Sequence, residues 1–134
     1  MITFNFPILY YLVLFSRINT TMAAVANLTI DQGATFSSAV TVKNSNGDAF
    51  NLTGHTVEAK MALGYSSTRT RTTITSSVSS ALDGIIQLSL TPAQTAALDA
   101  PARYVYDVEI TYTADSTVTR VIEGIITVRP NVTI

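Results

Sequence analysis

The stretch Ala102–Val128, ARYVYDVEITYTADSTVTRVIEGIITV, is the longest run of the chain in which apolar and polar side chains alternate. A period of two is typical of a strand with one buried and one exposed face, so the stretch predicts a long β-hairpin. The even positions from Tyr104 to Tyr112 form the buried face of its first strand. A polar loop at Thr113–Thr117 follows, and the second strand then returns along the first. Its residues on the same buried face are Val118, Ile122, Ile126 and Val128.

The register of this hairpin creates one electrostatic conflict. A hairpin symmetric about Asp115 places Tyr106 opposite Gly124, where an aromatic ring can cover the backbone that a strand glycine leaves bare. The same register places Asp107 directly opposite Glu123, and like charges in that arrangement repel each other. Two solutions stay open: a β-bulge at Gly124 that shifts the pairing, or an arginine side chain that lies between the two carboxylates.

Composition excludes several classes of protein. The chain has 134 residues, the size of one domain, and it has no cysteine, which excludes a disulfide scaffold, a thiolate zinc site and thiol catalysis. Its net charge is −1 and only 13% of its residues are charged, so it carries no basic stripe for nucleic acid. A surface with so little charge is poorly defended against association, which favours coverage by neighbouring subunits.

Residues 1–21 differ from the rest of the chain. The apolar run Phe6–Phe15 is about half the length that spans a bilayer, and no basic residue precedes Arg17, as a signal peptide would require. We expect translation to begin at Met22, so that residues 1–21 are a non-domain extension and residues 22–134 form a single domain. A signal peptide or anchor and a real folded element are the open alternatives for residues 1–21.

Five further strands are expected between Met22 and the hairpin. They are Asn27–Asp31, Ala34–Lys43, Thr56–Leu63, Arg69–Ser77 and Gly84–Leu90. The apolar residues that share one face of Thr56–Leu63 are Val57, Ala59 and Met61, and those that point inward from Gly84–Leu90 are Ile86, Leu88 and Leu90. The strand Arg69–Ser77 is rich in Ser and Thr and offers few residues for a core, so we place it at an exposed edge of the sheet. Arg69 and Arg71 would help to protect that edge from association.

A short helix precedes the hairpin. Thr91, Pro92 and Gln94 have the spacing of a capping box with proline at the first helical position. Seven strands with turn signals between them and one short helical crossover predict an all-β fold, an immunoglobulin-like antiparallel β-sandwich.

The sequence offers no convincing catalytic, cofactor-binding or metal-binding residues. His55 is the only histidine and lies in a predicted turn, while the Asn44–Asp48 turn has oxygen ligands at calcium-loop spacing but lacks the acidic start and the downstream glutamate. Asp107 and Glu109 both point outward from one strand, as the paired carboxylates of a carbohydrate-active enzyme would. No nucleophile, histidine or aromatic sugar platform accompanies them, so we expect a solvated face, no cofactor and no enzyme.

Several stretches together resemble a known family. They are Asn27–Phe36 (NLTIDQGATF), Phe50–Val57 (FNLTGHTV), Leu90–Leu98 (LTPAQTAAL), Ala102–Ile110 (ARYVYDVEI) and Val121–Val128 (VIEGIITV). This pattern resembles the small immunoglobulin-like structural proteins of tailed bacteriophages, including contractile-tailed phages of cyanobacteria, and is similar to the N-terminal domain of phage baseplate upper proteins. The resemblance covers about Asn27–Thr133. It implies a virion component of the tail, baseplate, neck or capsid surface that works by assembly and has no catalytic residues.

We therefore expect a non-enzymatic virion structural protein whose partners are copies of itself and other virion proteins, with no nucleic acid, membrane or small-molecule partner. The expected contacts are the edge strand at Arg69–Ser77 and the tail after the last strand, because a short tail can add to a neighbour's sheet. The candidate contact residues are Arg69, Arg71, Arg129, Pro130, Val132 and Ile134. Two alternatives stay open: a capsid decoration protein of the same fold, and a membrane-anchored or secreted surface adhesin with Phe6–Phe15 as its targeting segment.

Overall fold

The computed structural model describes residues 23–134, which form an all-β domain with one short helix, as predicted. The elements are β2 (Ala24–Val25), β3 (Leu28–Asp31), β4 (Phe36–Thr41), β5 (His55–Ala62), β6 (Thr72–Ser80), β7 (Ile85–Leu90), α1 (Pro92–Ala96), β8 (Ala102–Tyr112) and β9 (Thr117–Arg129). The predictions for residues 1–21, the targeting segment and the start at Met22 lie outside the described residues.

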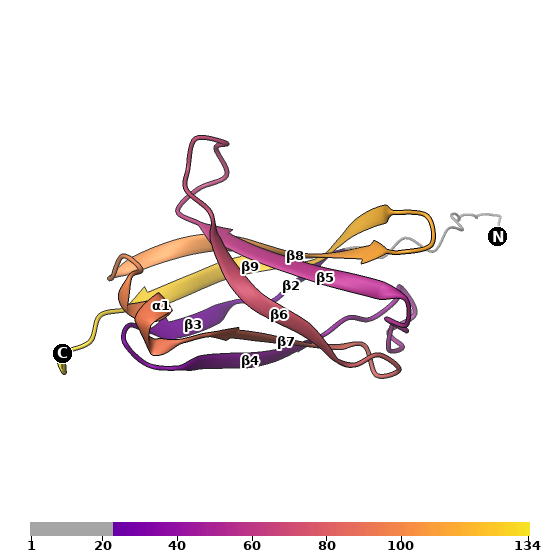
Figure 1. Ribbon diagram of the computed structural model, residues 1–134, viewed down its shortest axis with the longest axis horizontal. Helices are drawn as coiled ribbons and strands as arrows, with labels where there is room; N and C mark the ends of the chain where they lie inside the picture. The colour runs from indigo at the N-terminus through magenta and orange to yellow at the C-terminus, as the bar shows by residue number, and fades with distance from the viewer. Residues whose placement is uncertain (1–22) are drawn as a thin grey trace.

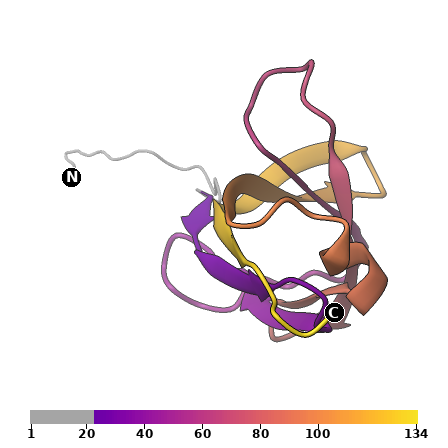
Figure 2. The same cartoon turned by 90° about the vertical axis from the view of Figure 1, so that its left-hand side faces the viewer.

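The eight strands of the described residues form one curled sheet. Its order is β2-β9-β8-β5-β6-β7-β4, and β3 also pairs with β9. In Figure 1, β9, β8 and β5 form one layer, β7 and β4 form the other, and β6 crosses between them. Figure 2 looks along the strands and shows the chain wrapped around a common interior. The two layers expected of a sandwich are therefore parts of a continuous sheet.

The sheet is mixed, which corrects the prediction that it is antiparallel throughout. The short strands β2 and β3 both run parallel to β9, with Ala24 beside Ile122 and Asp31 beside Arg129. A parallel pair requires a long connection between its strands. Almost the whole domain supplies that connection, because β3 and β9 stand at opposite ends of the described chain.

The β8–β9 hairpin confirms the predicted register at Tyr106, which lies opposite Gly124. Closer to the turn, Val108 pairs with Ile122 but Glu109 pairs with Arg120, so Val121 is an extra residue in a β-bulge. Between the bulge and the turn, the residues of β9 therefore point to the opposite face from the one predicted. Val118 points outward and is 57% exposed, so its predicted place on the buried face is wrong.

The strand β6 is central, so the predicted exposed edge at Arg69–Ser77 is wrong. Its first residues pair with β5 and its later residues with β7. Ile74 is buried, at 1% exposure. The high Ser and Thr content of this strand therefore led us to underestimate its contribution to the core. Arg69 and Arg71 precede β6 and lie in the loop that joins it to β5.

The helix α1 begins with the predicted capping box. The Thr91 side chain accepts a hydrogen bond from the Gln94 amide, and the Gln94 side chain accepts one from the Thr91 amide. Thr95 is fully buried and ties the helix to the turn between β3 and β4, because its Oγ1 accepts from the Gly33 amide at 3.0 Å and donates to the Ala34 carbonyl at 2.9 Å. The helix therefore closes one end of the curled sheet.

The core fills the interior between the two layers and is a single cluster. Except for Val57, which is half-buried, the predicted inward positions of β5, β7 and β8 as far as Ile110 are buried. They are Ala59, Met61, Ile86, Leu88, Leu90, Tyr104, Tyr106, Val108 and Ile110. Tyr112, the last predicted member, lies at the rim and is 40% exposed.

Candidate assembly surface

The outer face of β5, β8 and β9 is charged. In register across these strands, Lys60 lies beside Asp107, and Asp107 lies beside Glu123. Arg120 lies between the two carboxylates, with its Nε 3.2 Å from Asp107 Oδ2 and its Nη1 3.4 Å from Glu123 Oε1. The arginine solution to the predicted conflict is therefore confirmed, and the bulge sits at Val121 instead of Gly124.

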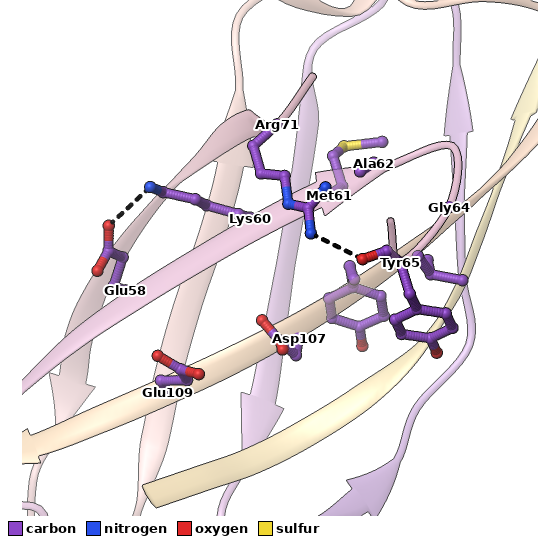
Figure 3. A pocket seen from close by; sticks show the side chains of 11 residues that line it. Glu58, Lys60, Met61, Ala62, Gly64, Tyr65, Arg71, Asp107 and Glu109 are labelled. Atoms are coloured by element: carbon purple, nitrogen blue, oxygen red, sulfur yellow. Dashed lines mark hydrogen bonds and ion pairs between the residues drawn. The ribbon is translucent and has the colours of Figure 1, made fainter. Parts of the chain in front are cut away.

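A shallow hollow of about 250 Å³ opens on this charged face (Figure 3). Its floor carries Glu58 directly opposite Glu109, and the Lys60 Nζ lies 3.4 Å from Glu58 Oε2. Asp107 thus lies between Lys60 and Glu123, and Glu109 lies between Glu58 and Arg120, so each carboxylate has one basic and one acidic neighbour. Among residues 23–134, no group of three His, Asp or Glu side chains lies close enough to hold a metal ion.

The loop between β5 and β6 rises from the body beside this hollow (Figures 1 and 2). Arg71 holds the loop together, because its guanidinium donates to the carbonyl oxygens of Ser66 at 2.8 Å, Arg69 at 3.0 Å and Tyr65 at 3.2 Å. The Tyr65 side chain is 72% exposed. Arg71 therefore organises a projecting loop, a different place from the sheet edge predicted for it.

The other half of the sheet carries no charge. The strands β4, β6 and β7 contain no Asp, Glu, Lys or Arg, whereas β5, β8 and β9 contain eight. The pairing arranges the outer face of β4, β7 and β6 in rows of small polar side chains. One row is Ser37, Ser89 and Thr75, and the next is Ala39, Gln87 and Ser77. Gln87 Nε2 donates to Ser37 Oγ at 2.6 Å, which links the two rows.

The uncharged half ends in a free edge. The strand order ends at β4, and no other strand in residues 23–134 pairs with its far side. Sheet edges are usually protected by charged side chains, proline or a bulge. The strand β4 has none of these, since it reads FSSAVT and pairs with β7 without a register shift. Within residues 23–134, this uncharged face that runs to an unprotected edge is the surface best suited to association.

The C-terminal tail lies at the same end of the molecule as the turn between β3 and β4. Arg129 belongs to β9, and its Nε donates to Asp31 Oδ1 at 2.7 Å, which lowers the pKa of that carboxyl. Beyond it, Val132 is 95% exposed and Ile134 is fully exposed. Arg129 therefore has an internal partner, while Pro130, Val132 and Ile134 are free to meet a neighbour.

His55 is packed more closely than a solvated turn residue. Its ring lies edge-on to Phe50 with centroids 5.4 Å apart and tilted against Tyr112 with centroids 4.9 Å apart. The sequence did not indicate this cluster, because Tyr112 is brought to His55 by the pairing of β5 with β8. No sequence signal pointed to the uncharged half either, since it is assembled from strands whose pairing the alternation alone does not fix.

Comparison with protein-family models finds none that matches the chain, and comparison with curated proteins finds none that is similar to it. Within residues 23–134, no helix is long and apolar enough to cross a bilayer. The functional assignment therefore depends on the surfaces described above and on the resemblance of the sequence stretches.

Proposed function

We propose that this chain is a non-enzymatic structural protein of a tailed-phage virion, a tail, baseplate or neck component that acts by protein–protein assembly. Its fold serves as a rigid module whose faces contact copies of itself and other virion proteins. The resemblance of its strand and turn stretches to immunoglobulin-like phage proteins supports this class.

The observation that carries the proposal is the separation of charge between the two halves of the sheet. The centres of protein interfaces are depleted of charged residues. The half formed by β4, β6 and β7 has no charge at all and exposes Ser, Thr and Gln side chains, while the charges collect on β5, β8 and β9. Such a division suits a module that is covered on one side and faces solvent on the other.

The charged face gives less support to an enzyme. Asp107 is held by Arg120 at 3.2 Å, and the same arginine holds Glu123 at 3.4 Å. Asp107 and Glu123 are thus both paired with the same cation, an arrangement that suits a solvated ion-pair network better than a catalytic acid and base. An Asp107→Asn variant with unchanged activity toward a glycan substrate would dismiss the carbohydrate-active alternative.

Mass spectrometry of purified phage particles tests the proposal. We expect abundant peptides from this chain, with Met22 or Ala23 as the most N-terminal residue. Finding the chain absent from particles and present in host membranes, with peptides from before Arg17, would contradict the proposal and favour the surface adhesin.

The position in the particle separates the tail component from a capsid decoration protein. Antibody labelling of intact particles in electron micrographs should mark the tail, baseplate or neck. Label spread over the capsid would replace our assignment with the decoration protein, for which the same uncharged face would contact the capsid lattice.

The tail Val132–Ile134 is a second contact that the proposal predicts. Because Arg129 also accepts a hydrogen bond from the Gln32 amide on its carbonyl oxygen, a deletion should begin after it to keep β3 in place. Removal of residues 132–134 should leave a folded domain that enters particles poorly. A truncated chain that enters particles normally would exclude the tail as a contact.

A further inference from the structure

We propose that the free edge of β4 pairs with the same edge of a second copy, antiparallel and about a two-fold axis at Ala39. The inference rests on the assembly role proposed above and names one contact that this role uses.

The backbone of β4 presents a row of donors and acceptors to the open side. The Val42 amide donates to the Gly84 carbonyl oxygen at 2.7 Å, which fixes the parity of the groups that face β7. Because these groups alternate in an antiparallel pair, the amides and carbonyls of Ser37, Ala39 and Thr41 face away from β7. All three residues are exposed, and no strand of residues 23–134 pairs with this edge.

The side chains at this edge allow close approach of an identical strand. An axis at Ala39 places Ala39 of one copy opposite Ala39 of the second, and Ser37 opposite Thr41. These side chains are small and uncharged, so no like charges meet and no bulky group separates the backbones. Pairing of identical patches about a two-fold axis is the commonest form of association in homo-oligomers.

The charged residues that flank β4 are compatible with this register. At one end, a groove of about 350 Å³ lies between β3 and β4 and is lined by Asp31 and Thr35. At the other end, Lys43 lines a second hollow beside Thr41. The axis places Lys43 of one copy opposite Thr35 of the second, next to the groove that holds Asp31. Lys43 therefore comes near the Asp31–Arg129 ion pair of the second copy at each end, and no two like charges are directly opposed.

The contact is small. The strand β4 has six residues, and one pair of strands of this length covers far less than the roughly 1,600 Å² of a stable interface. The dimer is therefore weak in dilute solution and gains from the high local concentration within an assembly. Covalent crosslinking tests such a weak contact more sharply than a measurement of molecular mass in solution.

A single cysteine at the axis provides that test. The chain has no cysteine of its own, so Ala39→Cys introduces one thiol per copy. Opposed residues of a hydrogen-bonded antiparallel pair have Cα atoms about 5.5 Å apart, a separation that a disulfide spans. Under mild oxidation of the full chain, we expect A39C to form a disulfide dimer about ten-fold faster than T127C, an exposed thiol on β9 outside the uncharged face.

Two further variants test the register. Ser37→Cys and Thr41→Cys should each crosslink slowly alone and rapidly when the two proteins are mixed. Circular dichroism should show the same β-rich spectrum for all variants. Equal rates for A39C and T127C, or no gain on mixing S37C with T41C, would overturn the β4 pair. If the chain is found in particles but A39C does not crosslink, the proposed function stands and the β4 pair is overturned. If A39C crosslinks but the chain is absent from particles, the β4 pair stands and the proposed function is overturned.

Discussion

Tyr106 reaches across Gly124 to the N-terminal strands: its hydroxyl donates to the Ala26 carbonyl oxygen at 2.5 Å, between β2 and β3. Gly124 leaves room for this crossing, because a Cβ there would overlap the Ala26 carbonyl oxygen and lie 2.9 Å from its carbon. Asn27 Oδ1 also accepts from the Ile125 amide at 3.0 Å. This cluster fastens the start of the domain onto β9.

Gly124→Ala should destabilise the domain by about 1–3 kcal/mol, because the new methyl group would press on backbone that cannot move independently. Urea denaturation followed by circular dichroism measures the loss. Gly64→Ala is the matched control, since a Cβ at Gly64 would meet its nearest atom at 3.6 Å. Equal stability of the two variants would show that Ala26 does not pack over Gly124.

Tyr106→Phe should change the response to alkali. Burial raises the pKa of Tyr106 to about 12, above the usual value of about 10. As the pH rises, the tyrosine hydroxyl of the unfolded chain loses its proton before that of the folded chain. The contribution of Tyr106 to the free energy of unfolding is therefore complete below pH ~10 and is lost as the pH rises toward ~12. In Y106F, the free energy of unfolding should fall less steeply over that range. An identical pH dependence in both proteins would contradict the buried hydroxyl.

Thr95→Val should destabilise the domain by about 1–3 kcal/mol, because the isosteric change leaves the partly buried Gly33 amide without its acceptor. Thr95→Ser keeps the hydroxyl and should lose less. Comparison of urea midpoints checks the difference. A T95V protein as stable as T95S would mean that the helix does not depend on this hydrogen bond.

Arg120→Ala should cost at most about 1 kcal/mol, because the ion pairs with Asp107 and Glu123 are partly exposed. The variant leaves two carboxylates opposite each other, so the difference from the natural chain should shrink as salt screens them. Unfolding in low salt and in about 1 M salt measures this trend. Arg103→Ala, on the outer face of the same sheet, controls for loss of a cation.

Arg71→Ala should loosen the loop between β5 and β6 without unfolding the domain. Amide hydrogen exchange in residues 63–71 should quicken by about ten-fold while exchange in the core strands stays the same. Arg69→Ala is the control, since the three carbonyl contacts belong to Arg71. Unchanged exchange in R71A would remove this role from the arginine.

Alternation predicted the parts of the fold in which one strand pairs with its neighbour in sequence. The register at Tyr106 and Gly124, the inward faces of β5 and β7 and the capping box of α1 follow from local rules. The bulge at Val121 was missed because it inserts one residue without a sequence signal, and it moved Val118 to the surface.

Pairing between distant segments could not be predicted in this way. The parallel strands β2 and β3 and the central place of β6 depend on how the whole sheet curls. The same limit applies to the candidate site. Low overall charge indicated association, but only the pairing of β4, β6 and β7 shows that the uncharged residues collect on one face.

Incorporation of matched charge variants into particles tests the assembly account most directly. Ser77→Glu places a charge on the uncharged face, and Thr127→Glu places the same charge on the exposed face of β9; both positions are exposed. Quantitative mass spectrometry of purified particles should show S77E depleted by about ten-fold or more and T127E near the natural level, because charge is excluded from interface centres. Equal incorporation of the two variants would contradict the claim that the uncharged half of the sheet is the assembly surface.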